Sequence, residues 1–100
     1  MDTTAVVVSP GGSATVTLTL RNRTRSQIRG EVQVASPWGT WEWVARPIRG
    51  VVVAAGATTT VEIEVAPPAD TVPGHAWLMA KVMWFGRAQY TETVRLEVRA

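Results

Sequence analysis

The sequence predicts an all-β domain, an immunoglobulin-like β-sandwich of about seven antiparallel strands connected as a Greek key. Apolar residues recur at every second position along most of the 100 residues, as they do in strands with one buried face. Val, Thr and Ile, which favour strands, make up about a third of the chain. Turn residues interrupt this alternation at short intervals, which is typical of two packed sheets of short strands.

The first part of the chain contains three predicted strands. Residues 5–8 are a short apolar run, which the turn sequence Ser9–Gly12 ends. Residues 14–20 place apolar side chains on one face and threonines on the other. Residues 28–34 alternate in the same way until Ser36–Pro37 breaks the pattern. The second and third strands are therefore expected to have one core face and one solvated face.

The middle of the chain is less regular. Residues 37–50 predict a short strand at 41–45 and a crossing loop. Residues 51–53 predict another short strand, and residues 55–57 a turn. Residues 58–65 alternate clearly, so their aliphatic side chains are expected to face inward and their polar side chains outward.

The last part contains a Pro-rich connector at 66–74, a long strand at 76–85, a turn at 86–88 and a final strand at 90–98. Such a long connector suits a crossover between two sheets better than a tight hairpin. The chain lacks the Cys…Trp…Cys spacing of antibody domains, and a small barrel is the alternative architecture.

Length and composition indicate one domain over residues 1–100 and exclude most enzyme chemistries. The chain has no Cys and one His, His75, which leaves no disulfide, no thiol nucleophile and no metal site. No Ser–His–Asp set and no phosphate-binding loop can be identified. Glu62 and Glu64 lie two residues apart on a strand, but both are expected to face water. We therefore predict a domain that is not an enzyme and that uses no metal or cofactor.

The formal net charge is +2, and the densest basic stretch is Arg21–Arg29. Arginine binds phosphate well, but this segment lies between two predicted strands and contains no aromatic residue to stack on bases. We interpret it as a solvated loop and predict no nucleic-acid partner; a polar contact with a neighbouring domain is the alternative. No apolar run approaches the roughly 20 residues of a membrane-spanning helix, so membrane insertion is not expected.

The strand at 76–85 departs from the pattern because both of its faces are apolar. One face is interpreted as core because its Ala and Val residues suit a packed interior. The opposite face and the following turn supply the candidate interface residues Trp77, Met79, Lys81, Met83, Phe85 and Arg87. An exposed patch of this kind marks an interface. Its cover is either the segment Trp38–Trp43 or another domain; a free ligand-binding surface and a homodimer through the same face are further alternatives.

Three tryptophans within six positions suggest a second kind of site. Flat aromatic rings stack on the apolar faces of sugar rings, and a neighbouring carboxylate accepts hydrogen bonds from hydroxyl groups. The candidate carbohydrate-binding residues are Trp38, Trp41, Glu42 and Trp43. The structural alternative is that these rings close one end of the sandwich.

The order of turns and strands resembles a known family. The segments Ser9–Asn22, Pro37–Gly39, 55–65 and 67–74 are similar, in this order, to immunoglobulin-like accessory domains of bacterial glycoside hydrolases, the type associated with α-galactosidases. The closing segment 81–91 resembles the C-terminal β-domain of actinobacterial family 38 α-mannosidase-like enzymes. The motifs are turn-and-strand patterns, which specify a fold better than a function.

This resemblance implies a non-catalytic module, excised from a larger multidomain protein that contains a glycoside hydrolase. Its partner would be the catalytic domain of the same polypeptide, which the module packs on or orients. The alternative function is a carbohydrate-binding module that uses the tryptophan cluster as an aromatic platform. The resemblance carries no catalytic residue onto this chain. The absence of Cys fits either side of a bacterial membrane, in a cytoplasmic or a secreted protein.

Overall fold

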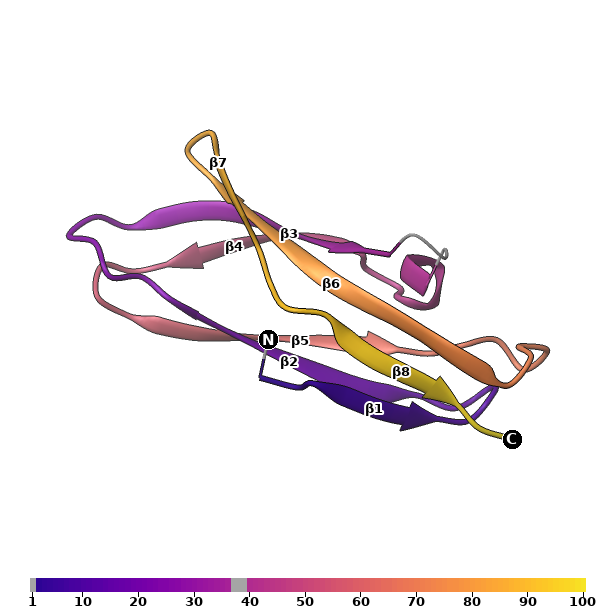
Figure 1. The fold of residues 1–100 in the computed structure, drawn as a ribbon. Coiled ribbons are helices and arrows are strands. Elements are labelled where there is room, and N and C mark those ends of the chain that lie inside the picture. The colour runs from indigo at the N-terminus through magenta and orange to yellow at the C-terminus, as the bar shows by residue number, and fades with distance from the viewer. Residues whose placement is uncertain (1, 37–39) are drawn as a thin grey trace.

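The protein is described by a computed structural model that covers residues 2–36 and 40–100, with only the backbone of Thr40 and Trp41. This part of the chain forms eight strands and one short 3₁₀ helix (Figure 1). In chain order they are β1 (Ala5–Val8), β2 (Ala14–Arg21), β3 (Ile28–Ala35), η1 (Thr40–Trp43), β4 (Ile48–Val53), β5 (Thr58–Val65), β6 (Gly74–Trp84), β7 (Arg87–Tyr90) and β8 (Val94–Val98). None of the described helical residues forms a helix long and apolar enough to cross a membrane.

The strands form two layers. The larger sheet has the order β1-β8-β6-β3-β4, and β7 extends the same edge of β6 beyond β8. The smaller sheet pairs β2 with β5 along their full length, from Ala14 opposite Val65 to Arg21 opposite Thr58. One pairing differs from the antiparallel prediction, because β1 runs parallel to β8. The connector 66–73 crosses between the sheets, as its length predicted.

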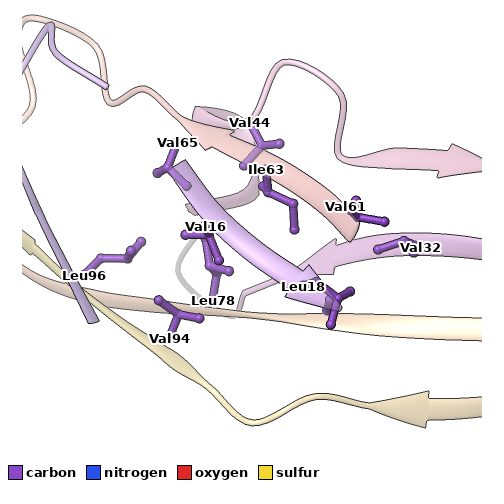
Figure 2. Close-up of a cluster of buried hydrophobic side chains, with 11 residues drawn as sticks. Val16, Leu18, Val32, Val44, Val61, Ile63, Val65, Leu78, Val94 and Leu96 are labelled. Carbon is purple, nitrogen blue, oxygen red and sulfur yellow. The ribbon is translucent and has the colours of Figure 1, made fainter. Parts of the chain in front are cut away.

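The core fills the space between the two layers. Alternate residues of β2 and β5 face alternate residues of β3, β6 and β8. Every second side chain of these strands is therefore buried, as the alternation of apolar and polar residues in the sequence predicts. The fully enclosed part lies near the middle of the molecule, where Leu78 of β6 and Val16 of β2 are both 0% exposed (Figure 2). The buried cluster consists of Val16, Leu18, Val32, Val44, Val61, Ile63, Val65, Leu78, Ala80, Val94 and Leu96.

The strand predicted at 41–45 is wrong: this segment begins with η1 instead. Val44 belongs to the buried cluster, and Trp43 packs against the same cluster. Two neighbouring residues of a strand point to opposite faces, so a strand would not place both of these side chains inward. The Trp43 carbonyl also accepts a hydrogen bond of 2.8 Å from the Ala66 N–H. The segment therefore closes one side of the sandwich.

The final strand predicted at 90–98 is two strands, β7 and β8, in different registers. Tyr90 of β7 lies opposite Lys81, whereas Val94 of β8 lies opposite Leu78. Three steps along β6 thus correspond to four steps on the facing chain, which is a β-bulge with one extra residue. The bulge places Tyr90 on the opposite face of the sheet from Val94, although their spacing of four residues would put them on the same face of a regular strand.

A side chain completes the hydrogen bonding at this bulge. The N–H of Thr91 donates to the carbonyl of Ala80 at 2.9 Å, as in a regular ladder. The N–H of Ala80, however, donates to the Thr91 hydroxyl Oγ1 at 2.9 Å. The hydroxyl thus satisfies a backbone amide of a residue that is completely buried.

The molecule is elongated, with principal extents of 47 × 20 × 19 Å. Its radius of gyration is 14.3 Å, against about 13 Å for a compact domain of this length. The β6–β7 hairpin diverges from the β2–β5 sheet (Figure 1). Increased twist and bending are the usual effects of a β-bulge, so we attribute the divergence of the hairpin to the bulge at its base.

Candidate interaction surface

The predicted interface residues lie on the outer face of the larger sheet, which the β2–β5 sheet does not cover. Leu78 and Ala80 of β6 point into the core, so the intervening side chains point outward. Trp77, Met79, Lys81 and Met83 are each half-buried there. Phe85, in the turn after β6, is 71% exposed.

The register of the sheet gives these residues their neighbours. Met79 lies opposite Ala35 of β3, and Met83 lies between Glu31 of β3 and Ala88 of β7. Lys81 lies opposite Tyr90, and its Nζ is 5.8 Å from the centroid of the tyrosine ring. This separation permits a cation–π interaction across the hairpin. The outer face is therefore a mixed surface, in which two methionines are set among charged and aromatic side chains.

The turn of the β6–β7 hairpin holds a strained residue. Phe85 and Gly86 are its two central residues, with φ of 46° and 75°. Two positive φ angles are the mark of a type I′ turn, for which Asn-Gly or Gly-Gly is the favoured sequence. A bulky side chain in this region has an unfavourable backbone conformation. The chain thus holds a large apolar ring at the tip of a projecting hairpin, at a cost in backbone energy.

Gly30 allows the base of this hairpin to pair closely with β3. It lies opposite Trp84, and a Cβ atom built on it would be 2.3 Å from the Met83 carbonyl oxygen. Real Cβ atoms do not come so close to an oxygen, so any other residue here would displace one of the two strands.

A shallow hollow of about 660 Å³ surrounds the outer base of the hairpin. Its lining includes three basic residues and one acidic residue, together with the apolar side chains of the strand and turn. The relevant lining residues are Arg29, Glu31, Lys81, Met83, Phe85 and Arg87. Within the described residues, four of the six predicted interface residues thus line this hollow. Met79, opposite Ala35, and Trp77, opposite Arg95, lie further along β6.

The part of the chain that the structure describes shows no aromatic platform among the residues predicted to bind carbohydrate. Trp43 packs against the core cluster, and its ring is half-buried. Glu42 is exposed. Trp38 and the side chain of Trp41 lie outside the described residues. For Trp43 the position supports the structural alternative, in which the ring closes one side of the sandwich.

A second hollow was missed by the sequence analysis. This edge cleft, of about 760 Å³, lies between the sheets on the side where β7 diverges from β2. Its walls are Leu18–Arg23 of β2 and the following loop, Ile28 and Gly30, Val51 and Val53, Val82–Trp84, and Gln89–Glu92. The only signal in the sequence is the polar run at 91–93, which interrupts the alternation at the bulge.

The loop beside the edge cleft is well organised by one buried polar residue. Asn22 is 2% exposed, and its Nδ2 donates hydrogen bonds to the carbonyls of Ser26 at 2.8 Å and Val53 at 3.0 Å. Its Oδ1 accepts from the backbone N–H of Thr24 at 2.9 Å. The first turn of the Arg-rich loop is therefore fixed, which holds the Arg21 and Arg23 backbone at the rim of the cleft.

Comparisons with known proteins identify the fold. No protein-family model and no curated protein sequence matches the chain. Among solved structures, a family 123 glycoside hydrolase from Clostridium perfringens superposes with a TM-score of 0.73 and 10% identity. A PapD-like domain of human CEP192 gives a TM-score of 0.56 with 9% identity, and the chaperone DraB of Escherichia coli gives 0.55 with 17%.

These likenesses confirm the predicted immunoglobulin-like β-sandwich. They extend over 97% of this chain for the glycoside hydrolase and the DraB chaperone, and over 98% for the CEP192 domain. This chain spans 23% of the length of the glycoside hydrolase chain, 81% of the CEP192 domain and 52% of the DraB chaperone. At such low identity the similarity is one of fold alone.

Proposed function

We propose that this domain is a non-catalytic accessory module of a bacterial glycoside hydrolase, which packs on and orients the catalytic domain of the same polypeptide. Two observations support the proposal. A region of similar fold makes up 23% of the length of a glycoside hydrolase chain. The outer face of β6 also carries apolar side chains that the described residues cover only in part.

The observation that carries this proposal is the conformation and exposure of Phe85. A strained, bulky residue in a two-residue turn is unfavourable for the isolated domain, and its exposed ring adds no packing to the core. Strained residues of this kind cluster at sites of function. A partner that buries the ring would recover apolar contact area, as aromatic anchors do at protein interfaces. We therefore place Phe85 at the centre of the docking surface, with Met83 beside it, Lys81 and Arg87 at the rim, and Met79 further along β6 on the same outer face.

The test compares the isolated domain with the parent polypeptide. Met79→Ser and Phe85→Ser, combined, are expected to lower the melting temperature of the parent polypeptide by several degrees, since they remove apolar contacts between domains. The isolated domain is expected to keep its melting temperature within about 2 °C, because neither Met79 nor Phe85 packs in or against the core cluster. Differential scanning calorimetry of both proteins measures the two effects.

The control is a pair of substitutions on the outer face of the other sheet, Thr15→Ser and Thr19→Ser, which should affect neither protein. Equal destabilisation of the isolated domain and the parent by the Met79 and Phe85 changes would contradict the docking role. A doubled mass of the isolated domain in light scattering, abolished by the same changes, would instead assign this face to a homodimer.

Carbohydrate binding by Trp38, Trp41, Glu42 and Trp43 stays a prediction, with a direct test. The domain is titrated with a panel of mannosides and galactosides while tryptophan fluorescence is recorded. A saturable change that Trp41→Ala removes would establish the aromatic platform. A flat response would leave the docking role as the function of the module.

A further inference from the structure

The two long sides of the sandwich are closed differently. On one side, the guanidinium Nη2 of Arg49 in β4 donates a 2.8 Å hydrogen bond to the Glu62 carbonyl of β5, and Trp43 bonds to Ala66 nearby. The first contact joins the two sheets, and the second joins η1 to the end of β5. On the other side, only residues 2–4 cross between the sheets among the described residues, and beyond them lies the edge cleft.

Residues 2–4 mark the point at which the two sheets cease to be joined on this side. The N–H of Asp2 donates to the Thr17 carbonyl of β2 at 3.0 Å, and the Thr4 carbonyl accepts from the Arg95 N–H of β8 at 3.0 Å. From Ala5 onward the chain continues along β8 as β1. The neighbouring part of the same sheet edge, β7, pairs with β6 alone among the described strands (Figure 1).

The free edge of β7 presents backbone groups in a known pattern. The register pairs Val82 with Gln89 and Lys81 with Tyr90. Thr91, one residue beyond, bonds to Ala80, and in an antiparallel ladder bonded pairs occur at every second residue. The N–H and C=O groups of Ala88 and Tyr90 therefore point away from β6, toward the edge where a further strand would add. An unpaired row of this kind is a template for strand addition.

The cleft below this edge would accept side chains of the added strand. Leu20 of β2 and Val82 of β6 are half-buried on facing walls, and Trp84 continues the upper wall toward the hairpin tip. These residues lie on the inner faces of the two sheets, at the end of the core, and Leu20 and Val82 pack against the core cluster but are only partly buried. Alternate apolar side chains of an added strand would enter this space and complete the core at its open end.

The charges around the open end define the partner further. Six of the ten basic residues and two of the eight acidic residues lie around the two hollows and the adjoining Arg-rich loop. The basic residues are Arg21, Arg23, Arg25, Arg29, Lys81 and Arg87, and the acidic ones are Glu31 and Glu92. The rest of the molecule carries more acidic than basic residues. Complementarity thus favours an acidic partner at this end.

A second copy of the chain is a poor occupant of this edge. Two copies joined edge to edge about a two-fold axis would bring the same surface of both together. The basic rims of both copies, which include Arg21, Arg23 and Arg87, would then meet at one interface, and like charges gathered in this way are unfavourable.

We propose that the free edge of β7 and the edge cleft bind an extended acidic peptide segment, in which apolar residues alternate with aspartate or glutamate, as an added β-strand. The peptide backbone pairs with Ala88 and Tyr90. Its apolar side chains enter the cleft against Leu20 and Trp84, and its acidic side chains, which alternate with them, point to the outer face on the side of Lys81, within the positive field of the basic rim. This site adjoins the docking face and shares its basic border, but the pairing with Ala88 and Tyr90 does not involve Phe85.

The test uses a fluorescein-labelled octapeptide in which valine alternates with glutamate, titrated with the 100-residue domain and followed by fluorescence anisotropy. A matched peptide with lysine in place of glutamate is expected to bind about tenfold more weakly, because the rim is basic. Raising the salt concentration is expected to weaken binding of the glutamate peptide. Equal binding of both peptides, or no anisotropy change with either at millimolar protein, would overturn the proposal.

The decisive variants are Tyr90→Pro and Tyr90→Thr. Both remove the tyrosine ring, but only proline removes the N–H that the added strand needs, and this N–H points away from the β6–β7 ladder. Tyr90→Pro is expected to weaken binding about tenfold relative to Tyr90→Thr. Equal affinities would overturn the proposal. Phe85→Ser is expected to leave the peptide affinity unchanged, so the two proposals fail independently.

Two further measurements guard against other outcomes. Arg21→Glu with Arg23→Glu provides a second variant pair if Tyr90→Pro fails to fold, as judged by circular dichroism; it is expected to weaken binding of the glutamate peptide about tenfold. Unchanged affinity of that variant would contradict the electrostatic part. Light scattering of the free domain is expected to give the monomer mass, and a dimer that Tyr90→Pro dissolves would overturn the proposal in favour of a second copy.

Discussion

The two halves of β6 differ although they belong to one continuous strand with one alternating pattern. In the first half, Leu78 and Ala80 are completely buried, because the β2–β5 sheet lies below them and β8 and β3 lie beside them. In the second half, Val82 and Trp84 occupy the same inner face but are only half-buried. The strand sequence is thus apolar throughout, and the neighbours decide how much of it is covered.

The difference begins at the bulge opposite the middle of β6. Next to the first half of β6 lies β8, which is paired on both sides, and residues 2–4 close the sandwich there. Next to the second half lies β7, whose outer edge pairs with none of the described strands, and here the hairpin diverges from the smaller sheet. The first half of β6 therefore contributes mainly to the core, and the second half contributes to the surface around the edge cleft. Substitutions in the two halves should separate these contributions.

The largest expected effect is in the closed half. Leu78→Ala should lower the free energy of unfolding by about 3 kcal/mol, since it leaves a cavity in a fully buried site. Val82→Ala, four residues further along the same face, should cost about 1 kcal/mol, because the side chain already borders the solvent-accessible cleft. Urea denaturation of both variants measures the difference. Equal losses would mean that the hairpin is as tightly packed as the core.

The next effect tests the base of the hairpin. Gly30→Ala should lower the free energy of unfolding by about 2 kcal/mol, because its Cβ would lie 2.3 Å from the Met83 carbonyl oxygen. Gly50→Ala on the neighbouring strand is the control, since the nearest atom to its Cβ would be 3.9 Å away. Thermal unfolding of the two variants provides the comparison. A Gly30→Ala protein as stable as the Gly50→Ala control would show that β3 and β6 are not closely held there.

The bulge itself is tested by the Thr91 hydroxyl. Thr91→Val should cost about 1.5 kcal/mol, because the N–H of buried Ala80 loses its 2.9 Å acceptor. Amide hydrogen exchange at Ala80 and Val82 should accelerate in this variant. Thr93→Val, at an exposed position of the same segment, is the matched control and should leave both quantities nearly unchanged.

The smallest effect has the opposite sign. Phe85→Asn should raise the free energy of unfolding of the isolated domain by about 1 kcal/mol, since asparagine tolerates the left-handed conformation of this turn position. Thermal unfolding measures the gain. A loss of stability instead would mean that the phenyl ring makes a compensating contact within the domain.

Much of the fold could be predicted because burial follows the sequence alternation. The strands expected at 14–20, 28–34 and 58–65 are confirmed as β2, β3 and β5 with small changes of boundary. The strand expected at 41–45 is wrong, because Trp43 and Val44 both meet the core of a sheet that is formed by distant segments. Local alternation contains no information about such a crossing segment.

The candidate surfaces were also only partly predictable from the sequence. The apolar residues on both faces of β6 correctly indicated that Trp77, Met79, Lys81 and Met83 lie on its outer face, whereas Phe85 lies in the turn that follows. They did not identify the edge cleft, because the cleft depends on one extra residue between Tyr90 and Val94. A bulge changes which face every later residue occupies, and only the partner strand shows where it lies.

The parallel pairing of β1 with β8 has a mechanical consequence. The two strands run in the same direction, so a force that pulls the start of β1 and the end of β8 apart acts along their shared ladder, from Ala5 opposite Arg95 to Val8 opposite Val98 (Figure 1). The backbone hydrogen bonds of the ladder are then loaded together in shear, and no single bond can open first as in a zipper. We expect the domain to resist stretching between its ends more strongly than its thermal stability suggests, and to yield in one step when the ladder slips.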